Sequence, residues 1–326
     1  EIILLFIALI PIIFFYFYFY LIDKSLKDRI GAELVANVFQ SHGVKQVFTL
    51  IGGHISSILV ACNKLNIKVV DVRHEVNTVF AADAISRLTK IPGVAIVTAG
   101  PGVTNTVTAL QNALMSESPL ILIGGASATL LKGRGALQDI EQISLMKTVC
   151  KRVYSCNQVK KIVPILKDAF KIAQTHPMGP VFVELPIDTL YPYETVLKEA
   201  GISNNKKQNL FTKIVNTYVK FQVDYVFDNA FVKEENYKPL IPRKLLSIPN
   251  NKIIQTSKIL SNSKKPLLVI GSQITQDKDR IQDSINYIKK MSIPCYLTGG
   301  ARGLLGKNSE LQYFHNRTPA LKEADV

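Results

Sequence analysis

The stretch DVRHEVNTVFAADAISRLTKIPGVAIVTAGPGVTNTVTALQNALMSE, residues 71–117, carries the pattern that decides the fold. Glu75 lies just past an apolar run, and apolar side chains then recur every four residues, as in an amphipathic helix. The run Val94–Val97 is typical of a buried parallel strand and leads through Gly-Pro-Gly, residues 100–102, into a second helical pattern. Because open α/β sheets bind ligands at the carboxyl ends of their strands, we expect a site at Glu75 and the glycine turn.

The sequence on either side repeats this alternation of strand and helix. Helical periodicity covers residues 31–42, 55–65 and 159–175, and residues 132–142 form a polar, glycine-bearing segment typical of a loop. Apolar strand-like runs lie at residues 46–51, 67–72, 94–97, 120–123 and 181–185. The alternation predicts an α/β fold with a doubly wound, mainly parallel sheet, which we assign to a domain of residues 23–190.

The second half of the chain changes in character before the pattern returns. Residues 191–250 are rich in Asn, Lys, Tyr and Pro, and we predict a linker or insert with one short helix at 211–226. Residues 251–326 then resume the order helix, strand, helix, strand, which predicts the start of a second α/β domain.

The N-terminus predicts a membrane anchor over residues 1–22. Ile2–Ile22 carries no charge, and about 20 apolar residues span a bilayer. A cleaved signal peptide is the alternative, but its apolar region usually has about 7–15 residues and precedes a small-residue cleavage site. Lys24, Lys27 and Arg29 follow the span, which places the rest of the chain in the cytosol by the positive-inside rule.

Composition limits the partners of this chain of 326 residues with a net charge of +14. The basic residues are spread out and not interleaved with aromatic side chains, so nucleic acid is not an expected partner. A basic surface would suit an anionic small molecule or a membrane face. The four cysteines form no CxxC pair and have no histidine at metal-ligand spacing, so we predict no metal site within this sequence. The chain starts without Met and stops in a strand-like run, which we interpret as a fragment at both ends.

From about Ile30 onward the chain resembles the acetolactate synthase superfamily of thiamine-diphosphate enzymes. The motifs, in chain order, are FTLIGGHIS, RHE with AADAISRLT, TAGPGVTNTVTAL, GALQDIEQIS, GPVFVELPIDTLYPY and IPCYLTGGARGLLG. The resemblance implies that the first domain is the family's pyrimidine-binding domain. It likewise implies that residues 251–326 are a truncated, Rossmann-like central domain. Within the superfamily the chain is similar to a membrane-anchored, lyase-type branch.

The resemblance assigns the main catalytic role to Glu75, which also contacts the cofactor. In the family this carboxylate bonds to N1′ of the aminopyrimidine and drives the imino tautomer that ionises the thiazolium C2. A carboxylate in a dry site suits this task, because electrostatic interactions are strong where water is excluded. The alternative is a surface glutamate paired with Arg73 or Lys68, since charged side chains are usually solvated.

The turn after the strand at residues 94–97 is expected to bind the cofactor. The resemblance places Thr98, Gly100, Pro101, Gly102 and Asn105 beside the pyrimidine ring, where glycine lets the backbone approach a flat ring closely. The alternative is an ordinary strand-to-helix turn, with Asn105 satisfying free backbone N–H groups at the start of the helix.

Two other segments contribute to the expected site. Residues 51–54, IGGH, fall where acetolactate synthases carry Pro-Gly-Gly-Ala, which implies cofactor contacts from Ile51 and Gly52. His54 replaces Ala and is a candidate acid or base, because a histidine pKa lies near neutrality; the alternative is a structural histidine. Gln138, in GALQD, matches a family glutamine that approaches cofactor and substrate, although alone it would be only a polar loop residue.

Three functions remain open from the sequence. Ile187 stands where typical acetolactate synthases carry Lys. That departure favours a thiamine-diphosphate-dependent carbon–carbon lyase. Such an enzyme would cleave 2-hydroxyacyl-CoA to formyl-CoA and an aldehyde one carbon shorter, as in fatty acid α-oxidation. The alternatives are an acetolactate synthase-type condensation of 2-oxoacids and a catalytically inactive, membrane-tethered scaffold, against which the retained Glu75 argues.

The resemblance also implies cofactors, partners and a location. Thiamine diphosphate and Mg²⁺ are expected, but the Gly-Asp-Gly motif that holds the metal does not occur here, so its ligands belong to a further C-terminal domain. Some relatives keep FAD, for which this sequence offers no support. A second subunit would complete the site, which implies a homodimer or tetramer, and the anchor would place the protein in the endoplasmic reticulum membrane with a cytosolic catalytic part.

Overall fold

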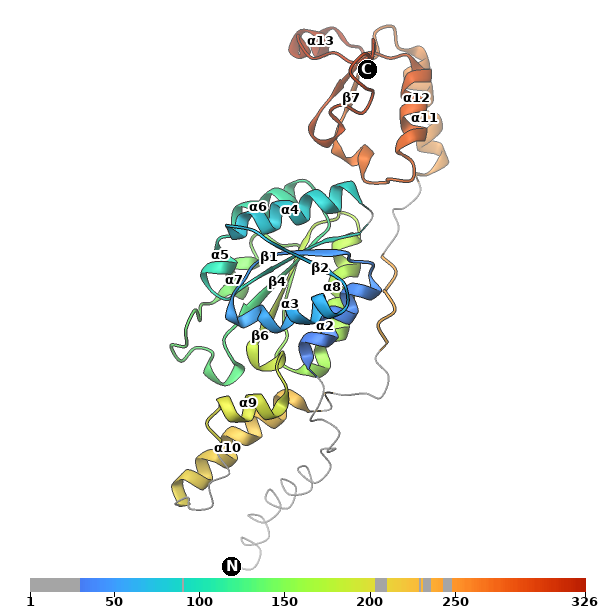
Figure 1. Cartoon of the computed structure of the whole chain (residues 1–326). Helices are drawn as coiled ribbons and strands as arrows, with labels where there is room; N and C mark the ends of the chain where they lie inside the picture. Colours follow the sequence, from blue (N-terminus) through green and yellow to red (C-terminus); the bar gives the residue numbers. More distant parts are fainter. Residues whose placement is uncertain (1–29, 90, 203–209, 229, 231–235, 243–247) are drawn as a thin grey trace, which may run out of the picture. The chain divides into compact units, whose positions relative to one another are not determined.

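The computed structural model describes residues 30–89, 91–202, 210–228, 230, 236–242 and 248–326 (Figure 1). The chain forms two compact units, the second of which begins at Lys244. Each unit has its own hydrophobic core among the described residues. The first unit contains every residue of the expected site.

A six-stranded sheet, in which all neighbouring strands are parallel, forms the centre of the first unit. The strands are β1 (Gln46–Leu50), β2 (Lys68–Asp71), β3 (Gly93–Val97), β4 (Leu120–Ala126), β5 (Arg152–Ser155) and β6 (Pro180–Pro186). Their order across the sheet is β2-β1-β3-β4-β6-β5. The central strands β3, β4 and β6 are buried along their whole length, as the continuous apolar runs predict.

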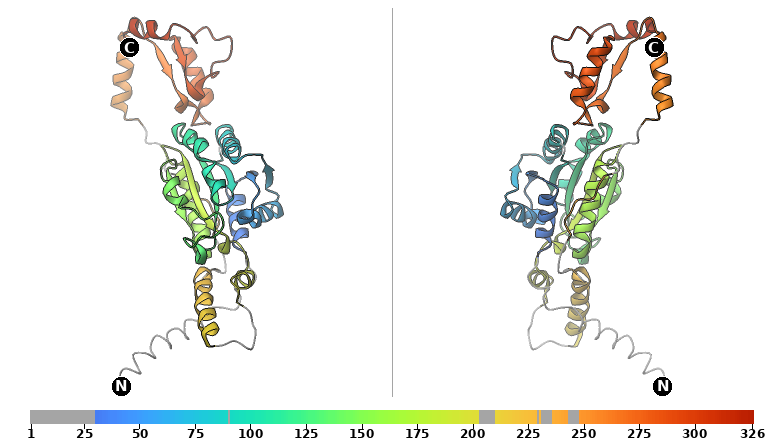
Figure 2. Two further views of the ribbon diagram at one scale, coloured as in Figure 1. Left: turned by 90° about the vertical axis from the view of Figure 1, so that its left-hand side faces the viewer. Right: turned by 90° about the vertical axis from the view of Figure 1, so that its right-hand side faces the viewer.

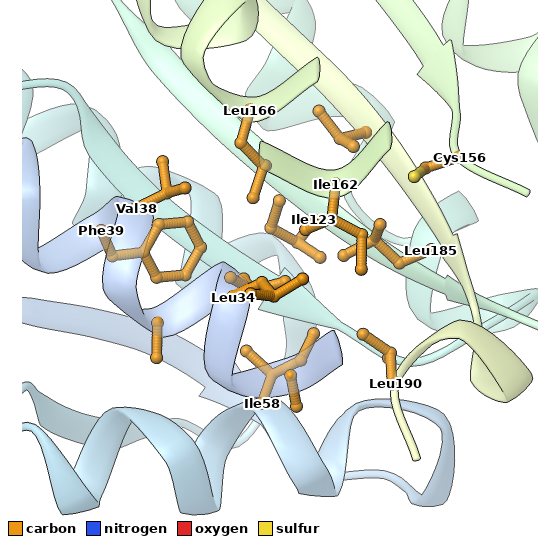
Figure 3. Packing of buried hydrophobic residues seen from close by; sticks show 14 of the residues in the cluster. Leu34, Val38, Phe39, Ile58, Ile123, Cys156, Ile162, Leu166, Leu185 and Leu190 are labelled. Carbon is orange, nitrogen blue, oxygen red and sulfur yellow. The ribbon is translucent and has the colours of Figure 1, made fainter. Parts of the chain in front are cut away.

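Three helices cover one face of this sheet: α2 (Gly31–Ser41), α3 (Ser56–Lys64) and α8 (Ile162–Gln174). Apolar residues recur at three- and four-residue spacing in α8, so one side of the helix reaches the core. Phe39 of α2 meets Phe170 of α8 edge to face, with ring centroids 6.2 Å apart. Side chains of the three helices converge on Ile123 of β4 and Leu185 of β6 (Figure 3).

The opposite face carries α4 (Glu75–Leu88), α6 (Val107–Met115) and the short α7 (Gln142–Met146). Figure 1 shows α4 and α6 side by side on this face, and the two helices are in contact. Val79 of α4 and Leu110 of α6 are fully buried with Leu122 of β4 and Phe182 of β6. Helices on both faces of a parallel sheet confirm the predicted α/β fold class.

Some elements escape the sequence pattern. The edge strand β5 is only half-buried, so it lacks the continuous apolar run that marks the inner strands. The segment predicted as a loop at residues 132–142 gives way to α7 at its last residue. Short 3-10 turns follow four strands or loops: η2 (Gly53–Ile55), η3 (Thr129–Leu131), η4 (Val159–Lys161) and η5 (Ile187–Thr189).

The segment after β6 packs on the first unit through two helices, α9 (Tyr193–Glu199) and α10 (Leu210–Phe227). They lie side by side in both views of Figure 2. The predicted helix at 211–226 is confirmed as α10, whereas α9 was not predicted. The Tyr193 hydroxyl donates a 2.5 Å hydrogen bond to Asp224, a carboxylate that is almost fully buried in α10.

The described residues of the second unit form two parallel strands, β7 (Leu268–Ile270) and β8 (Cys295–Leu297), and three helices. The helices are α11 (Asn250–Asn262), α12 (Ile281–Met291) and α13 (Arg317–Glu323). Its small core gathers residues of α12, β8 and the following turn, namely Ile288, Cys295, Leu297, Ala301 and Leu305. The order helix, strand, helix, strand agrees with the sequence pattern.

One expectation is corrected by the structure. No helix among the described residues is long and apolar enough to cross a bilayer. This finding contradicts the expected location as a single-pass protein of the endoplasmic reticulum membrane, and that expectation is withdrawn. Ile2–Ile22, on which the predicted transmembrane helix rested, lies outside the described residues.

We expect Phe170→Ala, in the whole protein, to lower the free energy of unfolding by about 3–5 kcal/mol, because it leaves a cavity between α2 and α8. Chemical denaturation followed by fluorescence or circular dichroism measures the change. Leu88→Ala is the control, since this α4 side chain is 80% exposed and should shift stability by less than about 0.5 kcal/mol. Equal effects of the two substitutions would contradict the assigned core.

Candidate active site

The strand order brings the two expected glycine turns together. Strands β1 and β3 are neighbours, while β2 lies on the far side of β1, so the chain reverses direction across the sheet between β1 and β3. Ligands of open α/β sheets bind at such a switch point. The turn after β1 and the turn after β3 touch there: a Cβ atom added to Gly52 would lie 2.5 Å from Cβ of Thr98. Gly52 is therefore required for this close approach.

The Gly-Pro-Gly turn is held in a backbone conformation that favours glycine. Gly100 has φ +61° and ψ −111°, and Pro101 begins the short helix α5 (Pro101–Thr104). The Gly100 N–H donates a 3.3 Å hydrogen bond to Oε1 of Gln142, and Nε2 of Gln142 donates a 2.9 Å hydrogen bond to the Gly125 carbonyl. Gln142 thus ties the turn to β4.

Glu75 is a buried carboxylate at the start of α4, with 8% of its surface exposed. Nδ2 of Asn105, just past α5, donates a 2.9 Å hydrogen bond to its Oε2. A Cβ atom added to Gly102 would lie 3.8 Å from Oε1, so a flat group could approach this oxygen over the glycine. The alternative pairing with Arg73 is wrong, because the Arg73 guanidinium contacts Asp71 instead.

A second line of polar groups runs beside the glycine turns. Nδ1 of His54, in η2, lies 3.2 Å from Oγ1 of Thr98. The Thr98 hydroxyl makes a long 3.5 Å contact to Oε1 of Gln138. Gln138 has φ +61°, and a Cβ atom added to Gly100 would lie 2.7 Å from its carbonyl oxygen. The loop that carries Gln138 therefore rests directly on the Gly-Pro-Gly turn.

The structure brings most of the expected site residues together, and two others lie beside them in the chain with exposed side chains. The connected set is Gly52, His54, Glu75, Thr98, Gly100, Gly102, Asn105 and Gln138. Ile51 is 66% exposed at the end of β1, and Pro101 is also exposed. Ile187 begins η5 after β6, which is separated from β3 by β4.

Sequence reasoning missed Gln142, a residue that shapes the turn. It is 2% exposed and bridges two segments that are 42 and 17 residues away in the chain. The only local signal is a glutamine that begins an apolar segment, Ile143–Met146, and this is too common a pattern to mark a site.

The described residues contain no group of three or more His, Cys, Asp or Glu side chains that could hold a metal ion. All four cysteines are free and buried. Burial raises the thiol pKa of Cys62, Cys150 and Cys156 to about 12, so these groups stay protonated and serve as core residues.

Comparison with known proteins shows a similarity over the part of the chain that carries the expected site residues. Residues 29–145 match the family model described as thiamine pyrophosphate enzyme, N-terminal TPP binding domain, thiamine pyrophosphate being another name for thiamine diphosphate. The predicted resemblance is confirmed, because residues 29–145 are similar to the N-terminal domain of this family.

Two similar relatives carry the same name. The chain is 51% identical over 298 residues to 2-hydroxyacyl-CoA lyase 2 of Danio rerio, covering 91% of this chain and 48% of the relative. It is 46% identical over 312 residues to 2-hydroxyacyl-CoA lyase 2 of Homo sapiens, covering 96% and 49%. The acetolactate synthase large subunit IlvG of Mycobacterium tuberculosis is 27% identical over 296 residues, covering 91% and 47%. The chain spans about half the length of these relatives.

We expect the imidazole of His54 to titrate below pH 6.5, because burial lowers its pKa from that ordinary value. The folded state then binds fewer protons than the unfolded state in acid. The neutral ring therefore contributes stability that is fully present above a pH of about 6.5 and is lost as the pH falls below it. NMR titration of the ring protons measures the pKa. In His54→Gln, the free energy of unfolding should depend less on pH in this range. A His54 pKa above 6.5 would contradict the assigned environment.

Proposed function

We propose that this chain carries the pyrimidine side of the active site of a thiamine-diphosphate-dependent carbon–carbon lyase. The substrate would be a 2-hydroxyacyl-CoA, and the products formyl-CoA and an aldehyde one carbon shorter. The observation that carries the proposal is the buried Glu75 carboxylate, held by Asn105 and facing Gly102 at the switch point of the sheet. The names of the relatives with 46–51% identity support the reaction.

The arrangement suits the pyrimidine of the cofactor. Bound thiamine diphosphate supplies a carbon that forms a carbanion and an electron sink. Glu75 would hold a proton at the ring nitrogen through Oε1, while Asn105 fixes Oε2 and so sets the direction of the carboxylate. Gly102 leaves open a position 3.8 Å from Oε1 that a Cβ atom would fill. Gly52 lets the turns after β1 and β3 meet, and Gly100 lets the loop with Gln138 come close.

His54, Thr98 and Gln138 are proposed to face the substrate side of the site. The imidazole is neutral near pH 7, because burial lowers its pKa, so it can either accept or donate a proton. The contact with Thr98 Oγ1 fixes the orientation of the ring. Gln138 presents an amide to the same space and would hold the substrate by hydrogen bonds.

The rest of the site is proposed to come from outside this chain. The described residues offer no cluster of Mg²⁺ ligands, so the diphosphate and its metal would be held by another domain. A second copy would supply that domain, which makes the working enzyme a homodimer or a larger homo-oligomer. We further propose that residues 251–326, which lie in the second unit, are the start of the central domain, with residues 191–250 forming a linker or insert.

An acetolactate synthase-type condensation is the second candidate function. The 27% identity to the mycobacterial synthase supports a shared cofactor chemistry. Ile187 argues against this candidate, because an apolar side chain stands where typical synthases carry a lysine, and a lysine would favour an anionic 2-oxoacid.

We expect Glu75→Gln in the whole protein to reduce kcat by about 10²–10⁴-fold, the range of general acid–base steps. The amide can still accept the hydrogen bond from Asn105, but it cannot take up the shared proton. The loss should appear in kcat more than in KM, because activation rather than substrate binding is impaired. C2–H exchange of the bound cofactor, followed by NMR, measures the step directly.

Asp83→Asn is the matched control for Glu75→Gln. Asp83 is another buried carboxylate of α4, held by two hydrogen bonds of 2.9 and 2.8 Å from Arg87. This substitution should lower stability and leave activity per folded molecule unchanged. Unchanged C2–H exchange in Glu75→Gln would remove Glu75 from the mechanism.

We expect the whole enzyme, supplied with thiamine diphosphate and Mg²⁺, to cleave 2-hydroxyacyl-CoA with a higher kcat/KM than it condenses pyruvate. The physical reason is the missing cation at Ile187. Chromatographic assay of aldehyde and acetolactate in parallel reactions provides the comparison. Acetolactate formation at the higher kcat/KM would contradict the lyase proposal and favour the synthase function.

A further inference from the structure

The loop that carries Gln138 is tied to a fully buried carboxylate outside the expected site. Glu184 on β6 has none of its surface exposed. A carboxylate in such a position needs partners, because an isolated buried charge is strongly disfavoured. Nζ of Lys132, from the loop after η3, lies 2.5 Å from Oε1 of Glu184, and the Ser155 hydroxyl on β5 donates a 2.8 Å hydrogen bond to the same oxygen.

The ion pair between Lys132 and Glu184 has few other polar partners among the described residues. Within the described part of the chain, Oε2 of Glu184 is buried and accepts no hydrogen bond. Lys132 is therefore the only positive charge that compensates Glu184 among the described contacts. If the loop lifted from the sheet, it would remove Lys132 and leave Glu184 as an uncompensated buried charge, which is strongly unfavourable.

The rest of the loop transmits this restraint toward Gln138. The Gly133 N–H donates a 2.5 Å hydrogen bond to Oδ2 of Asp139, so the residue after Lys132 is joined to the residue after Gln138. At the loop's start, the Thr129 N–H donates a 2.9 Å hydrogen bond to the buried Asp188. The far end of the loop is the contact between the Gln138 carbonyl and Gly100.

We propose that Lys132 is a positioning residue: its ion pair with Glu184 fixes the loop so that Gln138 lies against Gly100 and Thr98. This inference rests on the proposed function for the role of Gln138, but the restraint on the loop is a property of the fold. The pair spans 52 residues and joins β6 to the loop that covers the Gly-Pro-Gly turn.

Limited trypsin digestion of the whole protein tests the restraint without any catalytic assay. Arg134 is exposed in this loop, and we follow cleavage after it. In Lys132→Met the cut should be faster by about tenfold or more, because cleavage follows the population of the opened loop. Lys132→Arg, which keeps the charge, should restore most of the protection.

The matched control is Lys160→Met, which removes another lysine of the first unit. Lys160 pairs with Asp228 at 2.8 Å, and its side chain is 33% exposed, against 32% for Lys132. Cleavage after Arg134 should not change in this variant. If Lys132→Met fails to fold, the double variant Lys132→Met with Glu184→Gln removes both charges, and it should fold and still show the faster cleavage.

A double-mutant cycle then connects the loop to Gln138. Lys132→Met should lower kcat by up to about 10²-fold with a smaller change in KM, as expected when a catalytic group is misplaced by about 1 Å. Gln138→Ala should reduce kcat by a clearly smaller factor in the Lys132→Met background than in the parent enzyme, because Gln138 is already displaced in that background. In the Lys160→Met background, Gln138→Ala should reduce kcat by the same factor as in the parent enzyme.

Either of two results would overturn the inference. The first is an unchanged cleavage rate after Arg134 in a folded variant that lacks the ion pair. The second is an additive cycle between Lys132→Met and Gln138→Ala, which would make the pair a purely structural contact. Failure of the proposed function is distinguishable, because the trypsin result stands whatever substrate the enzyme takes.

Discussion

The burial of one carboxylate at a helix start constrains the rest of the site. With 8% of its surface exposed, Glu75 needs a directed hydrogen bond, and Asn105 provides it at 2.9 Å. That contact ties the start of α4 to the end of α5. In the turn before α5, Gly100 takes a positive φ, and a Cβ atom added to Gly102 would lie 2.9 Å from Cγ2 of Thr98. One oxygen of the carboxylate is thereby held, and the other faces the space above the glycine.

Much of this geometry follows from the sequence, because it depends on local patterns. Buried parallel strands show as continuous apolar runs, and their alternation with helices predicts the sheet and the edge at which Glu75 and the Gly-Pro-Gly turn meet. The contact between Gly52 and Thr98 follows once β1 and β3 are neighbours. The edge strand β5 does not follow, because its sequence RVYS holds no continuous apolar run, whereas the other edge strand, β2, lies within the apolar stretch at 67–72.

The parts that the sequence did not predict are side-chain contacts between distant segments. Gln142 reaches Gly100 across 42 residues and Lys132 reaches Glu184 across 52, and no local periodicity marks either pair. The positive φ of Gln138 also gives no signal, since glutamine has no particular preference for that conformation. Such contacts depend on how the loop after β4 crosses the sheet, which the secondary-structure pattern leaves open.

The loop after β4 shows how a parallel sheet positions residues that no strand carries. Its start and its lysine are held by Asp188 and Glu184, both at the carboxyl end of β6, while Gln138 rests on the turn after β3. Strand β4 lies between these two anchors. Because all strands of the sheet run the same way, their carboxyl ends form one edge, and a loop can be fixed at two places along it. Buried carboxylates suit this purpose, because releasing the loop would leave them without partners, which is unfavourable in free energy. This holds even though the ion pair of Lys132 with Glu184 adds little net stability.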